Sequence, residues 1–259
     1  MTFSFLLVKK FFPVFNALLT LIFSLLAIFL FQYSLIFYLV FSSLAISLSF
    51  LFSLLLLGKE IKQFWPLLIF FPLLIASLIF FLIFTRSQAV KIIFIFVASL
   101  FSYLFLATIF RFIYEPRKYP PYSLENFSFS LSFVFCFLFF SIIFALITFF
   151  NLAVGESLLF VIFVSLGLTT FTFWAIKNPV KRIYILIITF VLIELFYAMT
   201  FLPTSFYING LFLTAMFFLM IDMVIKKSKE GILTMRVIKK HIIFASLTLI
   251  SIMLLAQWR

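Results

Sequence analysis

The sequence predicts an all-α fold, a polytopic transmembrane helix bundle of about nine spans. Of its 259 residues, 67% are hydrophobic and only 10% are charged, and the mean hydropathy is +1.38. A soluble domain is about half apolar and a quarter charged, so the composition excludes this class. The apolar stretches are much longer than the roughly 10-residue alternating strands of a membrane barrel. Helices, which bond their own backbone groups, are therefore expected throughout.

Hydropathy and turn residues divide the chain into spans near the roughly 20 residues that cross about 30 Å of hydrocarbon. The predicted spans are 11–32, 35–57, 66–84, 92–113, 127–150, 157–176, 183–202, 206–225 and 242–257.

The first spans are bounded by charge and by one turn. Lys9 and Lys10 precede an apolar run, 11–57, that contains no Lys or Arg. A helix over this run would be about 70 Å long, so the chain must double back, and FQYS at 31–34 predicts the turn. The run is too long for the apolar part of a signal peptide, so we expect a first span that is retained.

A proline-rich cytoplasmic connection, 114–126, separates two groups of helices. Its three prolines interrupt a helix and favour extended backbone, and Ser123 is suited to cap the helix that follows. We therefore expect helices 1–4 over 1–113 and helices 5–9 over 127–259, within a single membrane domain.

The later spans follow from the same signals. The run 127–176 again lacks Lys and Arg, and NLAVGES at 151–157 predicts its turn. The polar stretch FLPTSFYING separates the seventh and eighth spans. The last span is short and crosses only if the bilayer thins or Trp258 and Arg259 reach the headgroups.

Basic residues predict a cytoplasmic N-terminus and an outer C-terminus. With nine spans in this orientation, 16 of the 19 Lys and Arg residues lie on the inner side, and only Arg86, Lys91 and Arg259 lie outside. This asymmetry is the positive-inside rule for short connections. The positive charge therefore reports topology and anionic lipid, and we expect no nucleic-acid partner.

Motifs for common enzymatic chemistry are missing from the sequence. It has no P-loop and no G-x-G-x-x-G, and its single histidine, His241, for which we expect an interfacial role, excludes H-E-x-x-H. Seven scattered acids offer no carboxylate cluster for Mg²⁺, and the lone Cys136 can build neither an intramolecular disulfide nor a thiolate metal site. We predict no catalytic residues, no metal and no cofactor.

Glu194 lies near the middle of the span 183–202, where a charge costs several kcal/mol, so it is the main functional candidate. We expect it to be uncharged and to face the bundle interior, near Tyr197 and within reach of Thr214. A structural hydrogen bond and a ligand site remain alternatives. The candidate ligand-binding residues are Glu194, Tyr197, Thr204, Ser205, Tyr207 and Asn209.

The basic connector 226–241 mixes basic and apolar residues. It is either a short amphipathic helix on the anionic inner leaflet or a plain connector. Just before it, Asp222 is expected to reach either water or Lys226 at i+4. The candidate lipid-surface residues are Lys226, Lys227, Lys229, Arg236, Lys239 and Lys240.

The C-terminal third combines ELFYAMTFLPTSFYINGLFLTAMFF with this basic connector and a closing Trp258 and Arg259. With Glu194, Pro203 and Asn209, it resembles a group of uncharacterised multi-pass membrane proteins from small-genome, uncultivated bacteria of candidate phyla. The resemblance implies a bacterial inner membrane and a multi-pass topology, and no activity.

We expect an integral protein of the cell membrane without enzymatic activity, carrier-like or an assembly scaffold, with an outer pocket near Glu194. Its partners would be the lipid bilayer, anionic lipid at the inner leaflet and, for a scaffold, another membrane protein. The alternative is a membrane-embedded enzyme acting on a lipid-linked substrate. Such an enzyme would need a second carboxylate or a base facing Glu194 across a wet cavity.

The topology is testable with a C-terminal reporter fusion. A reporter that is active only outside the cytoplasm should be active, because nine spans carry the C-terminus across the membrane. Activity of a reporter that works only in the cytoplasm would contradict the count.

Overall fold

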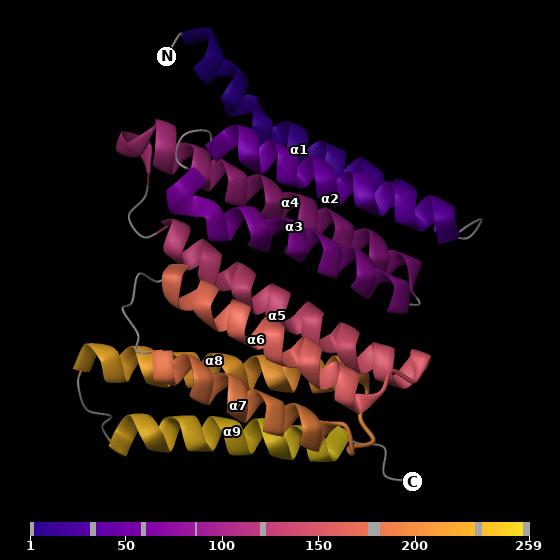
Figure 1. Ribbon diagram of the computed structural model, residues 1–259, viewed down its shortest axis with the longest axis vertical. Helices are drawn as coiled ribbons and strands as arrows, with labels where there is room; N and C mark the ends of the chain where they lie inside the picture. Colours follow the sequence, from indigo (N-terminus) through magenta and orange to yellow (C-terminus); the bar gives the residue numbers. More distant parts are fainter. Residues whose placement is uncertain are drawn as a thin grey trace. The chain divides into compact units, whose positions relative to one another are not determined.

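The computed structural model describes residues 3–31, 35–57, 61–85, 87–119, 123–175, 182–230 and 235–255. Within these ranges every regular element is a helix: α1 (Phe3–Phe31), α2 (Leu35–Leu57), α3 (Ile61–Phe84), α4 (Gln88–Tyr114), the 3₁₀ helix η2 (Pro116–Lys118), α5 (Ser123–Phe150), α6 (Val154–Ala175), α7 (Arg182–Met199), α8 (Phe206–Glu230) and α9 (Met235–Leu255) (Figure 1). The predicted all-α class is confirmed.

Among the described residues, six helices are long and apolar enough to cross a membrane. They are α1 from Lys9 to Leu26, α4, α5 from Asn126, α6 to Trp174, α7, and α8 to Ser228. Shorter apolar segments lie in α2 (Val40–Leu56) and α3 (Ile69–Phe84), and α9, whose first turns carry Lys239 and Lys240, is not among the six. The chain is a multi-pass membrane protein, and nine spans stay a prediction.

The helices belong to two compact units, Met1–Ser128 and Phe129–Arg259, so the first unit ends within α5. In the first unit α1 packs along both α2 and α4, and α2 packs along α3 (Figure 1). Aromatic pairs join these helices: Phe71 of α3 stacks on Phe105 of α4 with ring centroids 5.4 Å apart. Such pairs contribute about 0.5–1.5 kcal/mol beyond the area that they bury.

One chain of hydrogen bonds ties three helix ends of the first unit together. The buried Lys9 Nζ of α1 donates to the Tyr114 hydroxyl of α4 at 2.6 Å. That hydroxyl donates to the Leu56 carbonyl of α2 at 2.8 Å. The carbonyls of a last helical turn lack partners within their own helix, so Tyr114 satisfies one that would otherwise need water.

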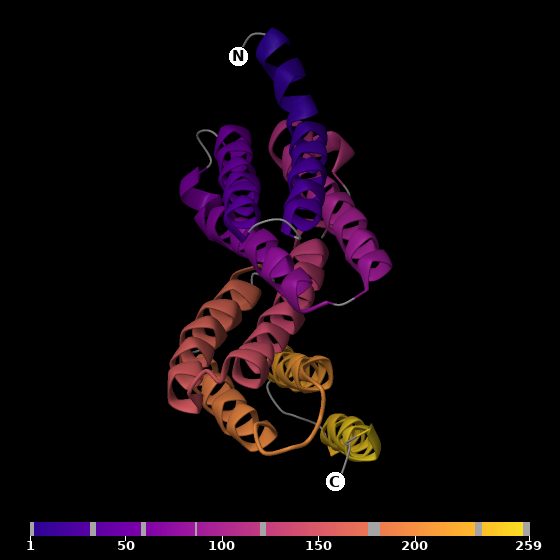
Figure 2. The ribbon, with the colours of Figure 1, turned by 90° about the vertical axis from the view of Figure 1, so that its right-hand side faces the viewer.

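In the second unit, α7 packs against α6 and α8, and α8 packs against α9. Figure 2 shows α8 and α9 nearly end-on. Several buried hydroxyls in these helices bond to the carbonyl one turn earlier, as Thr172 does with Leu168 (2.8 Å) and Thr214 with Gly210 (2.7 Å). This local bond lets an apolar helix bury a hydroxyl without a partner from another helix.

Several helices start or end at other residues than the predicted spans. α1 begins at Phe3, so Lys9 and Lys10 lie inside it, and α8 continues to Glu230 because the Lys-rich segment after Asp222 also forms helix readily. α7 ends at Met199, because Pro203 disfavours helical backbone at the residue before it and residues 200–202 form turns.

The turn predicted at 151–157 is confirmed at its first residues. Asn151 adopts a left-handed backbone with φ of 52°, and the Leu152 amide donates to the Leu146 carbonyl at 3.3 Å. Glu156 lies in the first turn of α6, where the helix dipole favours an acid. Most of the turn predicted at 31–34, and both Trp258 and Arg259, lie outside the described residues.

Gly210 sets how closely α8 approaches α5. A Cβ added at Gly210 would lie 2.8 Å from the backbone nitrogen of Ser141. Small residues permit such close approach between membrane helices. Nearby, Phe218 of α8 packs edge-on against Phe129 of α5, with ring centroids 4.8 Å apart.

Gly210→Ala should therefore destabilise the protein by about 1–3 kcal/mol, because the added methyl group overpacks against backbone that cannot rotate away. Gly167→Ala is the matched control, since nothing lies within 4 Å of an added Cβ at that helical glycine. Thermal unfolding in detergent measures both variants. Equal midpoints for the two would contradict the close contact.

Candidate functional site

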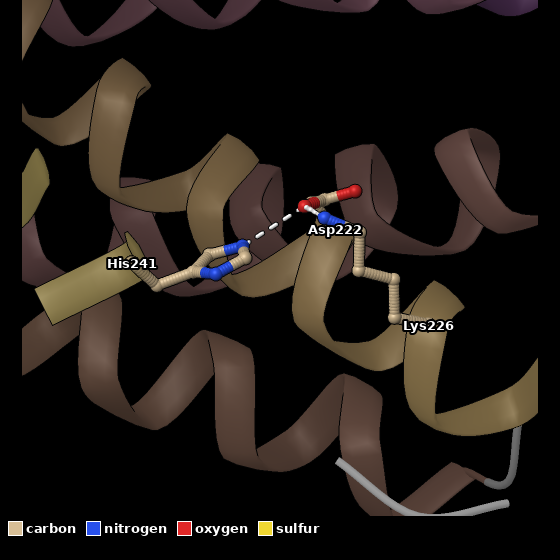
Figure 3. Close-up of polar contacts among 3 residues, drawn as sticks. All are labelled: Asp222, Lys226 and His241. Atoms are coloured by element: carbon tan, nitrogen blue, oxygen red, sulfur yellow. Dashed lines mark hydrogen bonds and ion pairs between the residues drawn. The ribbon is translucent and has the colours of Figure 1, made fainter. Parts of the chain in front are cut away.

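Asp222, Lys226 and His241 form a polar cluster where α8 meets α9 (Figure 3). The Asp222 Oδ2 atom accepts from Lys226 Nζ at 2.5 Å and lies 2.9 Å from Nε2 of His241. The His241 side chain is 9% exposed, whereas those of Lys226 and Asp222 are 37% and 45% exposed. One carboxylate oxygen thus serves a cation on its own helix and an imidazole on the next.

The sequence predicts one of these two contacts and not the other. The predicted pair of Asp222 with Lys226 is confirmed, because residues four apart lie on one face of a helix. The pairing of Asp222 with His241 was not predicted. The sequence does contain an indication of this contact. α8 and α9 are joined by a short connection, and Asp222 and His241 are nearly the same number of residues from its middle. If the two helices are antiparallel, both residues therefore lie at the same level.

The chemistry of this cluster follows from its hydrogen bonds. A carboxylate bonded to Nε2 holds the imidazole, a group that can exchange protons, in one orientation. The same bond also clamps the start of α9 onto α8. Both a proton-exchanging role and a clamping role therefore fit the geometry.

A cavity of about 180 Å³ adjoins His241 between α7, α8 and α9. Its lining residues, of which only His241 is polar, are Val191, Leu195, Met216, Leu219, Met220, Met223, Ile238, His241, Ile242 and Ala245. Small-molecule sites usually measure about 300–1,000 Å³, so this cavity suits a small apolar group and not a whole lipid-linked substrate.

Glu194 is exposed, so the prediction that it faces the bundle interior is wrong. The packed face of α7 consists of Ile188, Thr189, Leu192, Phe196 and Met199. Glu194 lies on the other face, between Phe190 and Tyr197, which are 61% and 50% exposed. The expected neighbour Tyr197 does share its face, since the two are three residues apart.

The Glu194 carboxyl makes no hydrogen bond or ion pair within the part of the chain that the structure describes. The proposed bond with Thr214 is wrong, because Thr214 is fully buried and donates to the Gly210 carbonyl. The cavity beside His241 does not include Glu194.

The remaining predicted ligand residues lie at the start of α8. Thr204 Oγ1 donates to the side-chain oxygen of Asn209, which is buried, and the Ser205 carbonyl accepts from the Asn209 amide at 3.1 Å. Tyr207 follows Phe206 in the first turn, and their rings are in contact. These contacts order the α7–α8 turn and do not join Glu194 in one site.

The basic connector is divided between two helices: residues 226–230 continue α8 and residues 235–240 begin α9. The prediction of a separate amphipathic helix over 226–241 is therefore wrong, because its first residues belong to α8 and its last residues belong to α9. Residues 231–234 lie outside the described residues. Lys227 lies over the Tyr184 ring at 5.3 Å, and Lys239 and Lys240 are exposed. The side chains of Lys229 and Arg236 are not described.

In the described ranges, no three His, Cys, Asp or Glu side chains come together as metal ligands. No curated protein and no solved structure matches the chain. Residues 58–255, which contain helices α3 to α9 together with Glu194, Asp222 and His241, match a family described as protein of unknown function (DUF5656). This match confirms the resemblance to an uncharacterised family. Because it covers more than half of the sequence, the chain belongs to the DUF5656 family.

Proposed function

We propose that the protein is a multi-pass protein of the cell membrane that works as an assembly partner, binding another membrane protein through the exposed face of α7. One observation carries the proposal: Glu194 lies on an exposed apolar face without a partner among the described residues. We infer that this face binds a transmembrane helix with a hydrogen-bonding side chain at the depth of Glu194.

A carboxyl that faces hydrocarbon without a partner raises the free energy of the protein. An ionised carboxylate facing lipid costs several kcal/mol, and a neutral one still buries a donor and an acceptor without partners. A hydroxyl or amide from a second helix would remove this cost, and interhelical bonds of this kind contribute about 0.6–2 kcal/mol. Tyr197 is one turn further on the same face and offers a second polar group.

A carrier-like function would instead require a ligand cavity at Glu194. The exposed position of Glu194 favours a helix partner over an enclosed ligand, because a flat apolar face buries a helix well and a small polar ligand poorly. The proposal therefore favours the scaffold over the carrier.

A second candidate, a membrane-embedded enzyme acting on a lipid-linked substrate, is favoured by the contact of Asp222 with His241. A carboxylate-held imidazole beside an apolar cavity is a suitable general base. An enzyme would need a base opposite Glu194. His241 is not this base, because the cavity that it lines includes Val191 and Leu195 but not Glu194. We therefore propose a clamping role for the cluster.

For orientation, we propose a cytoplasmic N-terminus and an outer C-terminus. The exposed Lys227, Lys239 and Lys240 at the facing ends of α8 and α9 would then contact the anionic inner leaflet. Each basic residue at such a surface contributes about 1 kcal/mol of attraction, which salt screens.

The α7 partner is testable by photocrosslinking in native membranes. A photoreactive phenylalanine analogue in place of Phe190 should give a discrete adduct of higher protein mass. The same analogue at Phe163 of α6, which is 73% exposed, is the control and should crosslink only lipid. Glu194→Leu should lower the Phe190 adduct roughly three- to thirtyfold, and Glu194→Gln should retain it, because the amide keeps a donor and an acceptor.

Two results would contradict the proposal. Lipid adducts alone at Phe190 would show that α7 faces the bilayer. An adduct without a gain in protein mass would show that another part of the same chain covers the face. A doubled mass would identify a second copy as the partner.

The clamp is tested by comparing two substitutions. Asp222→Ala leaves the buried His241 without its carboxylate and should lower the free energy of unfolding by about 1–3 kcal/mol. Lys226→Ala removes only a half-exposed ion pair and should cost less than about 1 kcal/mol. If thermal unfolding in detergent shows equal losses, the clamp is wrong and the proton-exchanging role gains support.

A further inference from the structure

A second cavity lies in the first unit, between α1 and α4. Its volume is about 520 Å³, within the range of about 300–1,000 Å³ that small-molecule sites occupy. The side chains that matter for its chemistry are Lys10, Phe11 and Val14 from α1, Tyr103 and Arg111 from α4, and Glu115 directly after α4.

The two cations that line the cavity are Lys10 and Arg111, and the hydrogen bond of the adjacent Lys9 determines which way Lys10 faces. Lys9 is held by the Tyr114 hydroxyl, and Lys10, about 100° further round the helix, lines the cavity instead. Arg111 lines it from the last turn of α4. Both Lys10 and Arg111 are exposed, and neither side chain makes a hydrogen bond or an ion pair with another described residue.

Apolar groups continue the same cavity beside this charged part. Phe11, Val14 and Tyr103 are 50%, 39% and 36% exposed, although each belongs to a helix that packs in the first unit. The cavity therefore offers two cations and an open apolar wall. A complementary ligand is an anion that carries hydrocarbon.

The depth of the site agrees with this chemistry. The apolar segment of α1 begins at Lys9 and that of α4 ends at Tyr114, so both cations lie where hydrocarbon gives way to headgroups. The carboxylate of Glu115 reduces the formal charge of the three ionisable groups to +1. This balance favours a singly charged phosphodiester over a doubly charged phosphate.

We propose that Lys10 and Arg111 bind the phosphate of a phospholipid, with its acyl chains along Phe11, Val14 and Tyr103. The guanidinium of Arg111 would supply a planar, bidentate contact and the Lys10 ammonium a second charge-assisted bond. Lys10 precedes the segment 58–255 that matches the family, so the site includes a part of the chain beyond the match. The proposal is independent of the α7 interface.

Native mass spectrometry of the full-length protein in detergent tests the site. After delipidation, dioleoylphosphatidylglycerol should bind as one retained lipid per chain. Dioleoylglycerol, which has the same chains and no phosphate, should bind at least tenfold more weakly, because two charge-assisted bonds are lost. Free glycerol phosphate should not displace the phospholipid at equal concentration.

Charge variants locate the lipid. Lys10→Gln together with Arg111→Gln should reduce retention about tenfold or more. Arg182→Gln, which removes an exposed cation at the start of α7, is the control and should leave retention unchanged. Equal binding of dioleoylglycerol, displacement by glycerol phosphate, or full retention in the Lys10 and Arg111 variant would each overturn the proposal. If that variant fails to fold, the comparison of dioleoylphosphatidylglycerol with dioleoylglycerol on the unaltered protein still tests the proposal.

Discussion

Each backbone amide and carbonyl that enters hydrocarbon must be bonded inside the protein, and most features of this chain follow from that requirement. Helices satisfy it along their length, so the described ranges contain helices and short connections. Several hydroxyls within them, such as those of Thr172 and Thr214, bond to a carbonyl of the preceding turn. Where the backbone leaves the helical path, at 200–205, the side chains of Thr204 and Asn209 bond to each other and local amides find nearby carbonyls.

Hydropathy predicts where such helices lie but not which way they face. In a soluble protein the apolar stripe of a helix marks its buried side, whereas in a membrane both sides are apolar. On α7 the buried Ile188 and Leu192 are chemically the same as the exposed Ile187 and Leu186. The position of Glu194 therefore could not be obtained from the pattern of its own span. It required the neighbouring helices.

Local contacts were accessible to sequence analysis and distant ones were not. Asp222 and Lys226 are one turn apart, so helical geometry alone predicts their contact. The contact with His241 depends on how α9 packs on α8, across a connection that lies outside the described residues. The cavity of Lys10 and Arg111 is a still more distant pairing, and charge patterning predicts only that both residues lie near the same membrane surface.

The hydrogen-bonded chain from Lys9 through Tyr114 to Leu56 also bears on the order in which the chain is made. Tyr114 is synthesised 105 residues after Lys9 and 58 residues after Leu56. At about 5–20 residues per second, Lys9 of α1 and Leu56 of α2 are made roughly 5–20 s and roughly 3–12 s, respectively, before the residue that joins them. During this interval the Lys9 ammonium has no Tyr114 hydroxyl to bond. The pair of α1 and α2 must therefore be stabilised in the membrane by its own packing until α4 is inserted.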